Sequence, residues 1–237
     1  MRPGLDEVRD RQFGVFTSWQ VLCEYTRAEM RARIDRGEWV RVFRGVYREA
    51  CTPTSARLRV EGARLLLGLP SVPAAYGTAA ELHGFSVRED EATHVLGERA
   101  SRSKRLVVHN DRVDQAELEV VQGVMATSAV RTAIDVARTL EWPEARAALE
   151  MALKQGVSRE ALIAEAARHE RRMGWGQAVE LLEVVGRAPR ARECVGRVDP
   201  RSFRGRPLYP VAVAPNNQLQ AGSRALNMEL PTRGGGN

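Results

Sequence analysis

Residues Thr17-Ser-Trp-Gln-Val-Leu-Cys-Glu-Tyr-Thr-Arg-Ala-Glu29 contain one helix-start signature twice. In a capping box, a Ser or Thr is followed three residues later by Glu or Gln, and the two side chains bond the free amides of the first helical turn. This spacing begins at Thr17 and again at Thr26. Two helix starts so close together predict short helices over residues 17–23 and 26–36, joined by a tight turn.

The residues after the second helix predict a β-hairpin. Gly37 is suited to end the helix, and Glu38-Trp-Val-Arg-Val-Phe43 alternates polar and apolar residues as a half-buried strand does. Arg44-Gly45 predicts a turn, after which a return strand begins. Helix, helix, strand, turn and strand is the order of a winged helix-turn-helix, so we predict such a domain over residues 1–50. We expect its core to contain Trp19, Leu22, Val40, Val42 and Tyr47, with Trp39 covering the junction of helix and wing.

The rest of the chain predicts a second domain and a tail. Residues 53–186 are expected to be mainly helical with a small sheet, and residues 187–237 to form a basic, Pro- and Gly-rich tail, disordered over much of its length. The fold class is therefore α+β, mainly helical. Predicted helices cover 54–67, 73–83, 128–140, 143–155, 159–168 and 175–185, and predicted strands cover 93–96, 106–109 and 119–122.

Composition and charge bound the function classes. No apolar run approaches the roughly 20 residues of a membrane-spanning helix, and the N-terminus lacks the apolar segment of a secretory signal, so a cytoplasmic protein without membrane contact is expected. The net charge is +6. From Arg187 onward, nine arginines and three acids carry that whole excess, and the preceding residues are neutral overall. A nucleic-acid surface in the folded part must therefore come from local clustering.

The sequence lacks the usual signatures of catalysis and metal binding. Its three cysteines form no Cys-x-x-Cys pair, its four histidines form no His-x-x-x-His pair, and no phosphate-binding Gly-rich loop or nucleophile elbow occurs. A metal-dependent nuclease site near the end of the chain would have to use Glu193, Asp199 and Glu229, which are too sparse. We therefore expect no catalytic residue, no metal site and no cofactor.

Arginines of the second predicted helix and of the hairpin are the candidate DNA-binding residues. Arg27 and Arg31 are four residues apart and share one helix face. Guanidinium groups on an exposed helix can donate to guanine O6 and N7 in the major groove, or pair with phosphates. The alternative is a solvated face balanced by Glu29, Asp35 and Glu38. The full candidate set is Arg27, Arg31, Arg33, Arg36, Arg41, Arg44 and Arg48.

Several phrases together resemble the AbiEi-type antitoxins of type IV toxin–antitoxin systems, in their actinobacterial form. The most specific covers the predicted wing, Arg36-Gly-Glu-Trp-Val-Arg-Val-Phe-Arg-Gly-Val-Tyr47. The similarity extends over about residues 10–185. The supporting phrases are Phe13-Gly-Val-Phe-Thr-Ser-Trp-Gln-Val-Leu22, Ala75-Tyr-Gly-Thr-Ala-Ala-Glu-Leu-His-Gly84 and Val124-Met-Ala-Thr-Ser-Ala-Val-Arg-Thr-Ala-Ile-Asp135.

This resemblance implies a winged helix that binds double-stranded promoter DNA and represses its own operon, with contacts carried by Arg31, Arg33, Arg41 and Arg44. It also implies a C-terminal part that counteracts a nucleotidyltransferase-like toxin. A homodimer is compatible with one recognition helix per chain. Many relatives continue into an endonuclease-like domain, whereas this sequence loses family character after Gly196, which suggests a truncation or frameshift. Two alternatives remain: a nuclease-family protein with a degenerate, inactive C-terminal domain, and a protein-interaction module whose DNA contacts are incidental.

Overall fold

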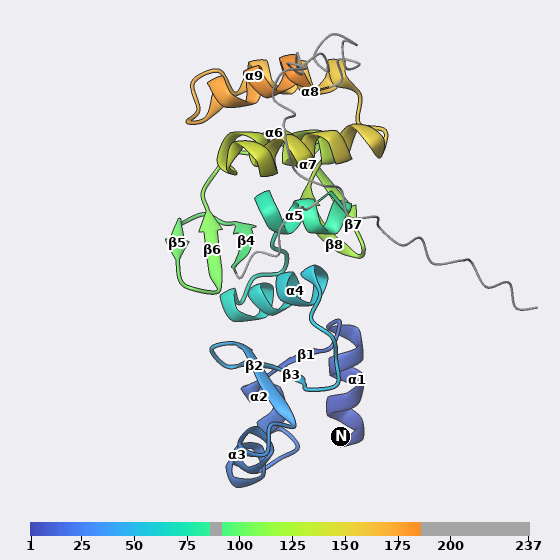
Figure 1. The fold of residues 1–237 in the computed structure, drawn as a ribbon. Coiled ribbons are helices and arrows are strands. Elements are labelled where there is room, and N and C mark those ends of the chain that lie inside the picture. Colours follow the sequence, from blue (N-terminus) through green and yellow to red (C-terminus); the bar gives the residue numbers. More distant parts are fainter. Residues whose placement is uncertain (86–91, 186–237) are drawn as a thin grey trace, which may run out of the picture. The chain divides into compact units, whose positions relative to one another are not determined.

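The N-terminal elements occur in the order that we expected for a winged helix, with one additional helix and strand in front. The computed structural model describes residues 1–85 and 92–185. Both predicted helices and both hairpin strands are confirmed within one or two residues at their ends. In chain order the elements are α1 (Pro3–Arg11), β1 (Val15–Thr17), α2 (Ser18–Leu22), α3 (Arg27–Asp35), β2 (Trp39–Phe43) and β3 (Val46–Glu49), as Figure 1 shows.

Both capping boxes are formed, and they explain where α2 and α3 begin. The Thr17 amide donates to Gln20 Oε1 at 2.7 Å, and the Gln20 amide donates to Thr17 Oγ1 at 3.2 Å. The same reciprocal pair links Thr26 and Glu29, at 2.7 Å and 3.2 Å. Each box satisfies amides that have no partner within the helix.

A three-stranded antiparallel sheet of order β1-β3-β2 closes the N-terminal module. Beneath it, Trp39 packs edge-to-face on Phe16 and Tyr25, with ring centroids 5.2 Å and 5.4 Å apart. Trp39 is therefore core, 2% exposed, and does more than cover a junction. The expectation that Trp19 and Val40 are core is wrong, because they are 80% and 37% exposed. Val21 occupies the buried face of α2, and two residues along a helix point to nearly opposite sides.

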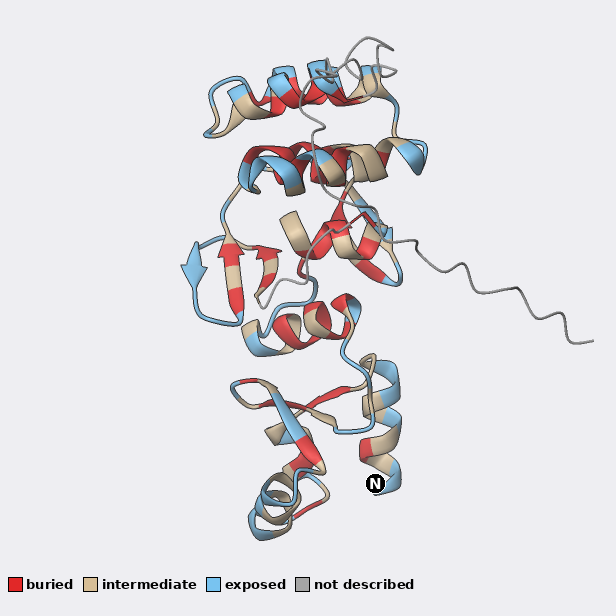
Figure 2. Ribbon diagram, viewed as in Figure 1, coloured by how far each residue is buried: buried red, intermediate tan, exposed pale blue. Residues whose placement is uncertain are grey.

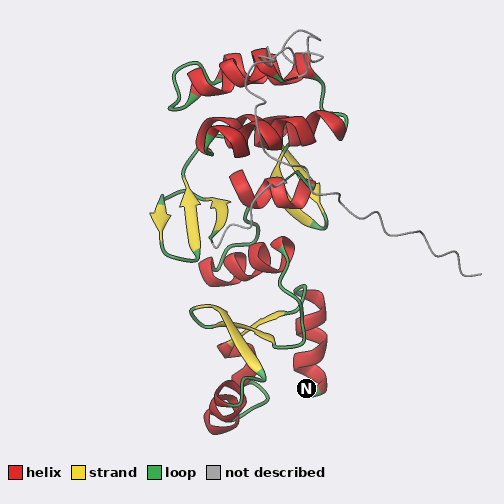
Figure 3. Cartoon of the chain, in the orientation of Figure 1, coloured by secondary structure: helices red, strands yellow, loops and turns green. Residues whose placement is uncertain are grey.

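The remaining described elements form a mainly helical domain with small sheets, so the predicted α+β class is confirmed (Figure 3). Predicted strands 93–96 and 106–109 and helix 159–168 coincide with observed elements. The helix expected to begin at Pro73 begins later, because Ala74 pairs with two strands. These elements are α4 (Ala56–Leu67), α5 (Tyr76–His83), β4 (Thr93–Leu96), β5 (Ser101–Arg102), β6 (Leu106–His109), β7 (Leu118–Val121), β8 (Val124–Thr127), α6 (Ala129–Thr139), α7 (Trp142–Lys154), α8 (Arg159–Arg168) and α9 (Trp175–Val184).

Helix α6 lies at the centre of the helical part and packs against α5, α7, α8 and α9. Figure 2 shows the buried faces of α6 and α7 turned toward their neighbours. Many contact positions are alanines, among them Ala133, Ala137, Ala148 and Ala152, all at most 1% exposed. Small side chains at these positions let the helix backbones approach closely. Among the described elements, no helix has the length and apolar character needed to cross a bilayer.

Helix α4 connects the N-terminal module to the rest through one hydrophobic cluster, called here the α4 cluster. It includes Val15 and Phe43 from the first sheet and Leu58 from α4. It also includes Val95 and Val108 from the second sheet, which has the strand order β4-β6-β5. Gly62 allows close contact, because a Cβ there would lie 3.1 Å from the Phe43 ring.

The boundary expected between residues 50 and 53 falls just before this shared helix. The tail beyond residue 186, with Glu193 and the suspected truncation point, lies outside the described residues.

Candidate nucleic-acid interface

The outer face of α3 carries two arginines that pair with no acidic group of residues 1–85 and 92–185. Arg27 and Arg31 are exposed, and in the described part of the chain neither forms a hydrogen bond or ion pair. The opposite side of α3 is held by Met30 and Ile34, which pack half-buried against the aromatic core. The helix therefore presents a fixed pair of guanidinium groups, one turn apart, to solvent.

Two further candidates on this helix are engaged within the module. Arg33 Nη1 contacts Glu38 Oε2 at 2.7 Å, and Arg36 Nε contacts Glu38 Oε1 at 2.6 Å. The guanidinium of Arg33 also lies over the rings of Tyr25 and Trp39, 5.2 Å and 5.3 Å from their centroids. The hydrogen bond from Arg36 has the largest effect on the pKa of Glu38. Together with the charges of Arg36 and Arg33 it holds that pKa below its ordinary value.

Of the three acids that could balance the arginines, two are already occupied. Glu38 binds Arg33 and Arg36, and Glu29 caps α3 while binding Arg2 Nη2 at 2.7 Å. Asp35 is exposed at the end of α3 and forms no ion pair with a described residue. The solvated-face alternative therefore loses part of its support around Arg27 and Arg31.

The hairpin fixes its tip against the start of α2. The Ser18 amide donates to the Gly45 carbonyl at 2.8 Å, and Gly45 has a φ of +75°, which favours glycine in this turn. Arg44 is exposed at the tip without a described partner, and Arg41 lies over the Tyr47 ring at 5.9 Å. Arg48 is used internally: it donates to the carbonyls of Glu49, Ala50 and Thr52.

Trp19 is exposed, although its hydrophobicity predicted a place in the core. Its sequence neighbour Ser18 bonds the wing tip through its backbone amide. The spacing within α2 could have predicted this exposure. If Val21 faces the core, a residue two positions away on the same helix faces solvent. Large aromatic side chains are enriched in contact surfaces.

A second polar cluster surrounds Tyr76 at the start of α5. Tyr76 has a φ of +50°, which is uncommon for a bulky residue. Its ring stacks on His109 at 4.1 Å, and its hydroxyl donates to Asp111 Oδ2 at 2.5 Å. His109 in turn bonds His94, ring nitrogen to ring nitrogen, at 2.9 Å. Burial first, then the nearby charge of His94, lowers the pKa of His109.

Three potential metal ligands, Glu117, Glu165 and His169, converge in the helical core with ligand atoms within 4.8 Å of one another. This group was not predicted from the sequence, although Glu165 and His169 are one helical turn apart. Arginines already neutralise these carboxylates: Arg168 Nη1 lies 3.3 Å from Glu117 and 3.2 Å from Glu165. Arg131 Nη1 lies 3.4 Å from Glu117. The group is thus a buried ion network in which arginines, in place of a metal ion, balance the carboxylates.

Arg131 is the central cation of this network. Its side chain is 2% exposed, and its Nε donates to Asp135 Oδ2 at 2.8 Å. Asp135 also accepts from Arg138 Nη2 at 2.7 Å. The Asp114 amide and the charges of Arg131 and Arg168 hold the pKa of Glu117 below its ordinary value, against the opposing effect of burial.

One segment of the chain matches a family of antitoxin domains. Residues 72–184 match the family model of the AbiEi antitoxin C-terminal domain, which confirms the AbiEi-type resemblance for this segment. Two Mycobacterium tuberculosis proteins, "Uncharacterized protein Rv2248" and "Uncharacterized protein MT2308", are each 36% identical over 177 residues. The alignment covers 73% of this chain and 64% of each relative's length.

A solved structure shares the fold. The crystal structure of the RV2827C protein from Mycobacterium tuberculosis has a TM-score of 0.53 to this chain, at 16% sequence identity. The match covers 77% of this chain and 76% of that one.

Replacing Arg131 with Ala should lower the free energy of unfolding by about 3–5 kcal/mol, because it removes the most buried cation from Asp135 and Glu117 and leaves each with one arginine. Urea unfolding followed by circular dichroism at pH 7.5 measures the loss. The matched control is Arg146→Ala on α7, which breaks an exposed pair with Glu150 and should cost less than about 1 kcal/mol. Equal losses in the two variants would contradict the role of the network.

Stability should fall as the pH drops below about 6.5, the ordinary pKa of histidine. Because the pKa of His109 is lower in the folded chain, the unfolded chain binds the proton more readily, and acid favours unfolding. Asp111 and Asp135 oppose the shift, while Arg102 adds to it. Urea midpoints at pH 7.5 and 5.5 should differ less in His109→Gln than in the unaltered chain. The pKa of His169 is lowered too, so part of the difference between the two urea midpoints should remain in His109→Gln. If the difference in this variant equals that of the unaltered chain, His109 does not contribute.

Proposed function

We propose that this chain is a DNA-binding, antitoxin-type transcriptional regulator that represses its own operon and has no catalytic activity. The observation that carries the proposal is the pair of arginines on the exposed face of α3 that have no acidic partner among the described residues, together with Arg44 on the wing. A helix placed after a tight turn and followed by a hairpin is suited to enter the major groove while the wing follows the backbone. The partner is double-stranded promoter DNA.

The seven candidate arginines divide into two roles under this proposal. Those whose guanidinium groups form neither an ion pair nor a hydrogen bond with a described residue contact the duplex. Arg27 and Arg31 reach base edges or phosphates from α3, and Arg41 and Arg44 reach the backbone or minor groove from the wing. Those with internal partners position the contact surface: Arg33 and Arg36 fix the end of α3 through Glu38, and Arg48 fixes the end of the hairpin.

The antitoxin role is assigned to residues 72–184, which match the AbiEi domain. Under this proposal they counteract a nucleotidyltransferase-like toxin, the partner that the family resemblance implies. Residues 1–50 form the DNA-binding domain, and residues 53–186 form the antitoxin-like domain. One recognition helix per chain gives limited affinity, so two copies bind two half-sites of the operator. The nuclease alternative depends on acids outside the described residues and gains no support.

Replacing Arg44 with Ala should reduce the salt dependence of binding to the gene's own upstream DNA. Removing one arginine–phosphate pair lowers the slope of log K against log salt by about 1. Arg31→Ala should instead cost about 1–3 kcal/mol and relax the choice of one operator base. Electrophoretic mobility shifts across a salt series measure both effects. Arg146→Ala is the control, and indistinguishable binding by all three variants would refute the interface.

The two roles should separate by mutation. In cells where the neighbouring gene's product alone arrests growth, the full chain carrying Arg31→Ala and Arg44→Ala should still restore growth. Both substitutions lie outside the matched segment 72–184. Colony counts at equal protein levels, judged by immunoblot, measure the rescue, with an empty vector as control. Loss of rescue by the double variant would show that neutralisation needs the DNA-binding surface.

A further inference from the structure

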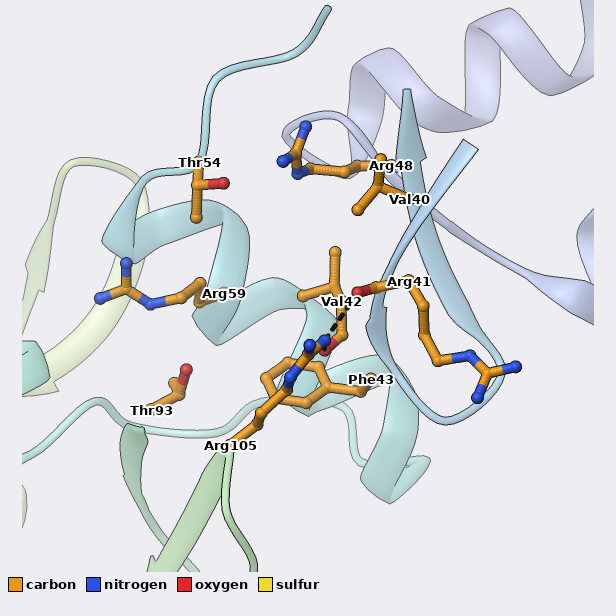
Figure 4. A pocket seen from close by; sticks show the side chains of 9 residues that line it. All are labelled: Val40, Arg41, Val42, Phe43, Arg48, Thr54, Arg59, Thr93 and Arg105. Atoms are coloured by element: carbon orange, nitrogen blue, oxygen red, sulfur yellow. Dashed lines mark hydrogen bonds between the residues drawn. The ribbon is translucent and has the colours of Figure 1, made fainter. Parts of the chain in front are cut away.

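A cavity of about 260 Å³ lies where the hairpin, α4 and the second sheet meet (Figure 4). Four of its lining residues are arginines, and none of the described lining residues is acidic. Ligand sites are usually concave, with a few convergent polar groups fixing the ligand's position. The lining residues are Val40, Arg41, Val42, Phe43, Arg48, Thr54, Arg59, Thr93 and Arg105.

Two of the cavity's cations bind only neutral groups among the described residues. Arg105 Nη1 donates to the carbonyls of Arg41 and Val42, at 2.9 Å and 3.3 Å, which Figure 4 marks with dashed lines. Arg48 likewise donates to backbone carbonyls. Neither Arg48 nor Arg105 has a carboxylate of a described residue within salt-bridge distance. Arg59 differs, because Glu81 neutralises it at 2.5 Å. Among the described residues, the charges of Arg48 and Arg105 therefore have no compensating carboxylate.

The cavity also has hydrogen-bond donors without acceptors. Thr93 is fully buried, and its hydroxyl has no partner among the described residues. Nε of Arg59 is buried and unpartnered as well. In Figure 4 the Thr93 hydroxyl points toward the space between Arg59 and Arg105. Buried polar groups nearly always have a partner, so two unmet donors beside uncompensated charge indicate a missing acceptor that is negatively charged.

We propose that this cavity binds a phosphate group. Its oxygens accept hydrogen bonds from Thr93 Oγ1 and Arg59 Nε, and its charge is balanced by Arg105 and Arg48. A water molecule could satisfy one donor but would leave the charges unbalanced. The phosphate comes either from a free phosphorylated small molecule or from the backbone of DNA; the second source rests on the proposed function. Because Arg105 holds the carbonyls of β2, an occupied cavity acts directly on the wing strand.

The binding arm of the test uses thermal unfolding and isothermal titration of the full chain with inorganic phosphate and pyrophosphate, against chloride at equal ionic strength. Thr93→Val keeps the side-chain shape and removes an unmet buried hydroxyl, so it should fold normally. Both Thr93→Val and Arg105→Ala should weaken phosphate binding by at least about tenfold, the effect of one hydrogen bond to a charged group. Arg146→Ala should bind as the unaltered chain does.

A second arm identifies the source by measuring operator binding of the same variants. If the DNA backbone is the source, both variants weaken operator binding, and Arg105→Ala also lowers its salt slope by about 1. If a small molecule is the source, operator binding is unchanged while phosphate binding is lost. The proposal is overturned if phosphate has no effect beyond that of chloride, or if Thr93→Val binds it like the unaltered chain. Failure of the DNA-binding proposal is a separate result, namely no operator binding by the unaltered chain.

Discussion

The α4 cluster is the constraint on which the rest of the structure depends. Helix α4 packs on all three strands of the N-terminal sheet and also on β4 and α5. Its Leu58 is 1% exposed within a cluster that holds residues from both sheets. Each buried side chain of this kind contributes about 1.5–3 kcal/mol. The candidate DNA-binding surface and the AbiEi segment, which begins at residue 72, are thus linked through one shared core.

Local pairing of charges, more than net charge, distinguishes the surfaces of this protein. In the buried network, Arg131 and its neighbours are matched by carboxylates, and the result is structural. On α3 the arginines divide, since Arg33 is paired and stacked whereas Arg31 has no ion pair to a described residue. The cavity beside the wing is a third case, in which Arg105 binds backbone carbonyls alone among the described groups. Arginine side chains therefore have three different roles in this protein, and the groups that surround each one determine which role it has.

Local signals predicted much of the fold, and tertiary contacts account for the rest. The capping boxes at Thr17 and Thr26 placed both short helices correctly, because a cap needs only four consecutive residues. Trp19 was misplaced, since hydrophobicity alone does not tell which face of a five-residue helix is buried. The Glu117 network joins segments far apart in the sequence, and the cavity at Thr93 joins three separate elements, so neither was visible in the sequence.

The exposure of Trp19 gives the protein an optical handle. The chain has four tryptophans. Trp39 lies in the aromatic core at 2% exposure, whereas the indole of Trp19 is 80% in contact with water. Indole emission shifts to shorter wavelength when its surroundings become less polar. A molecule that covers α2 therefore changes the fluorescence of Trp19 while leaving that of Trp39 nearly constant, so occupancy of this face can be followed without any attached dye.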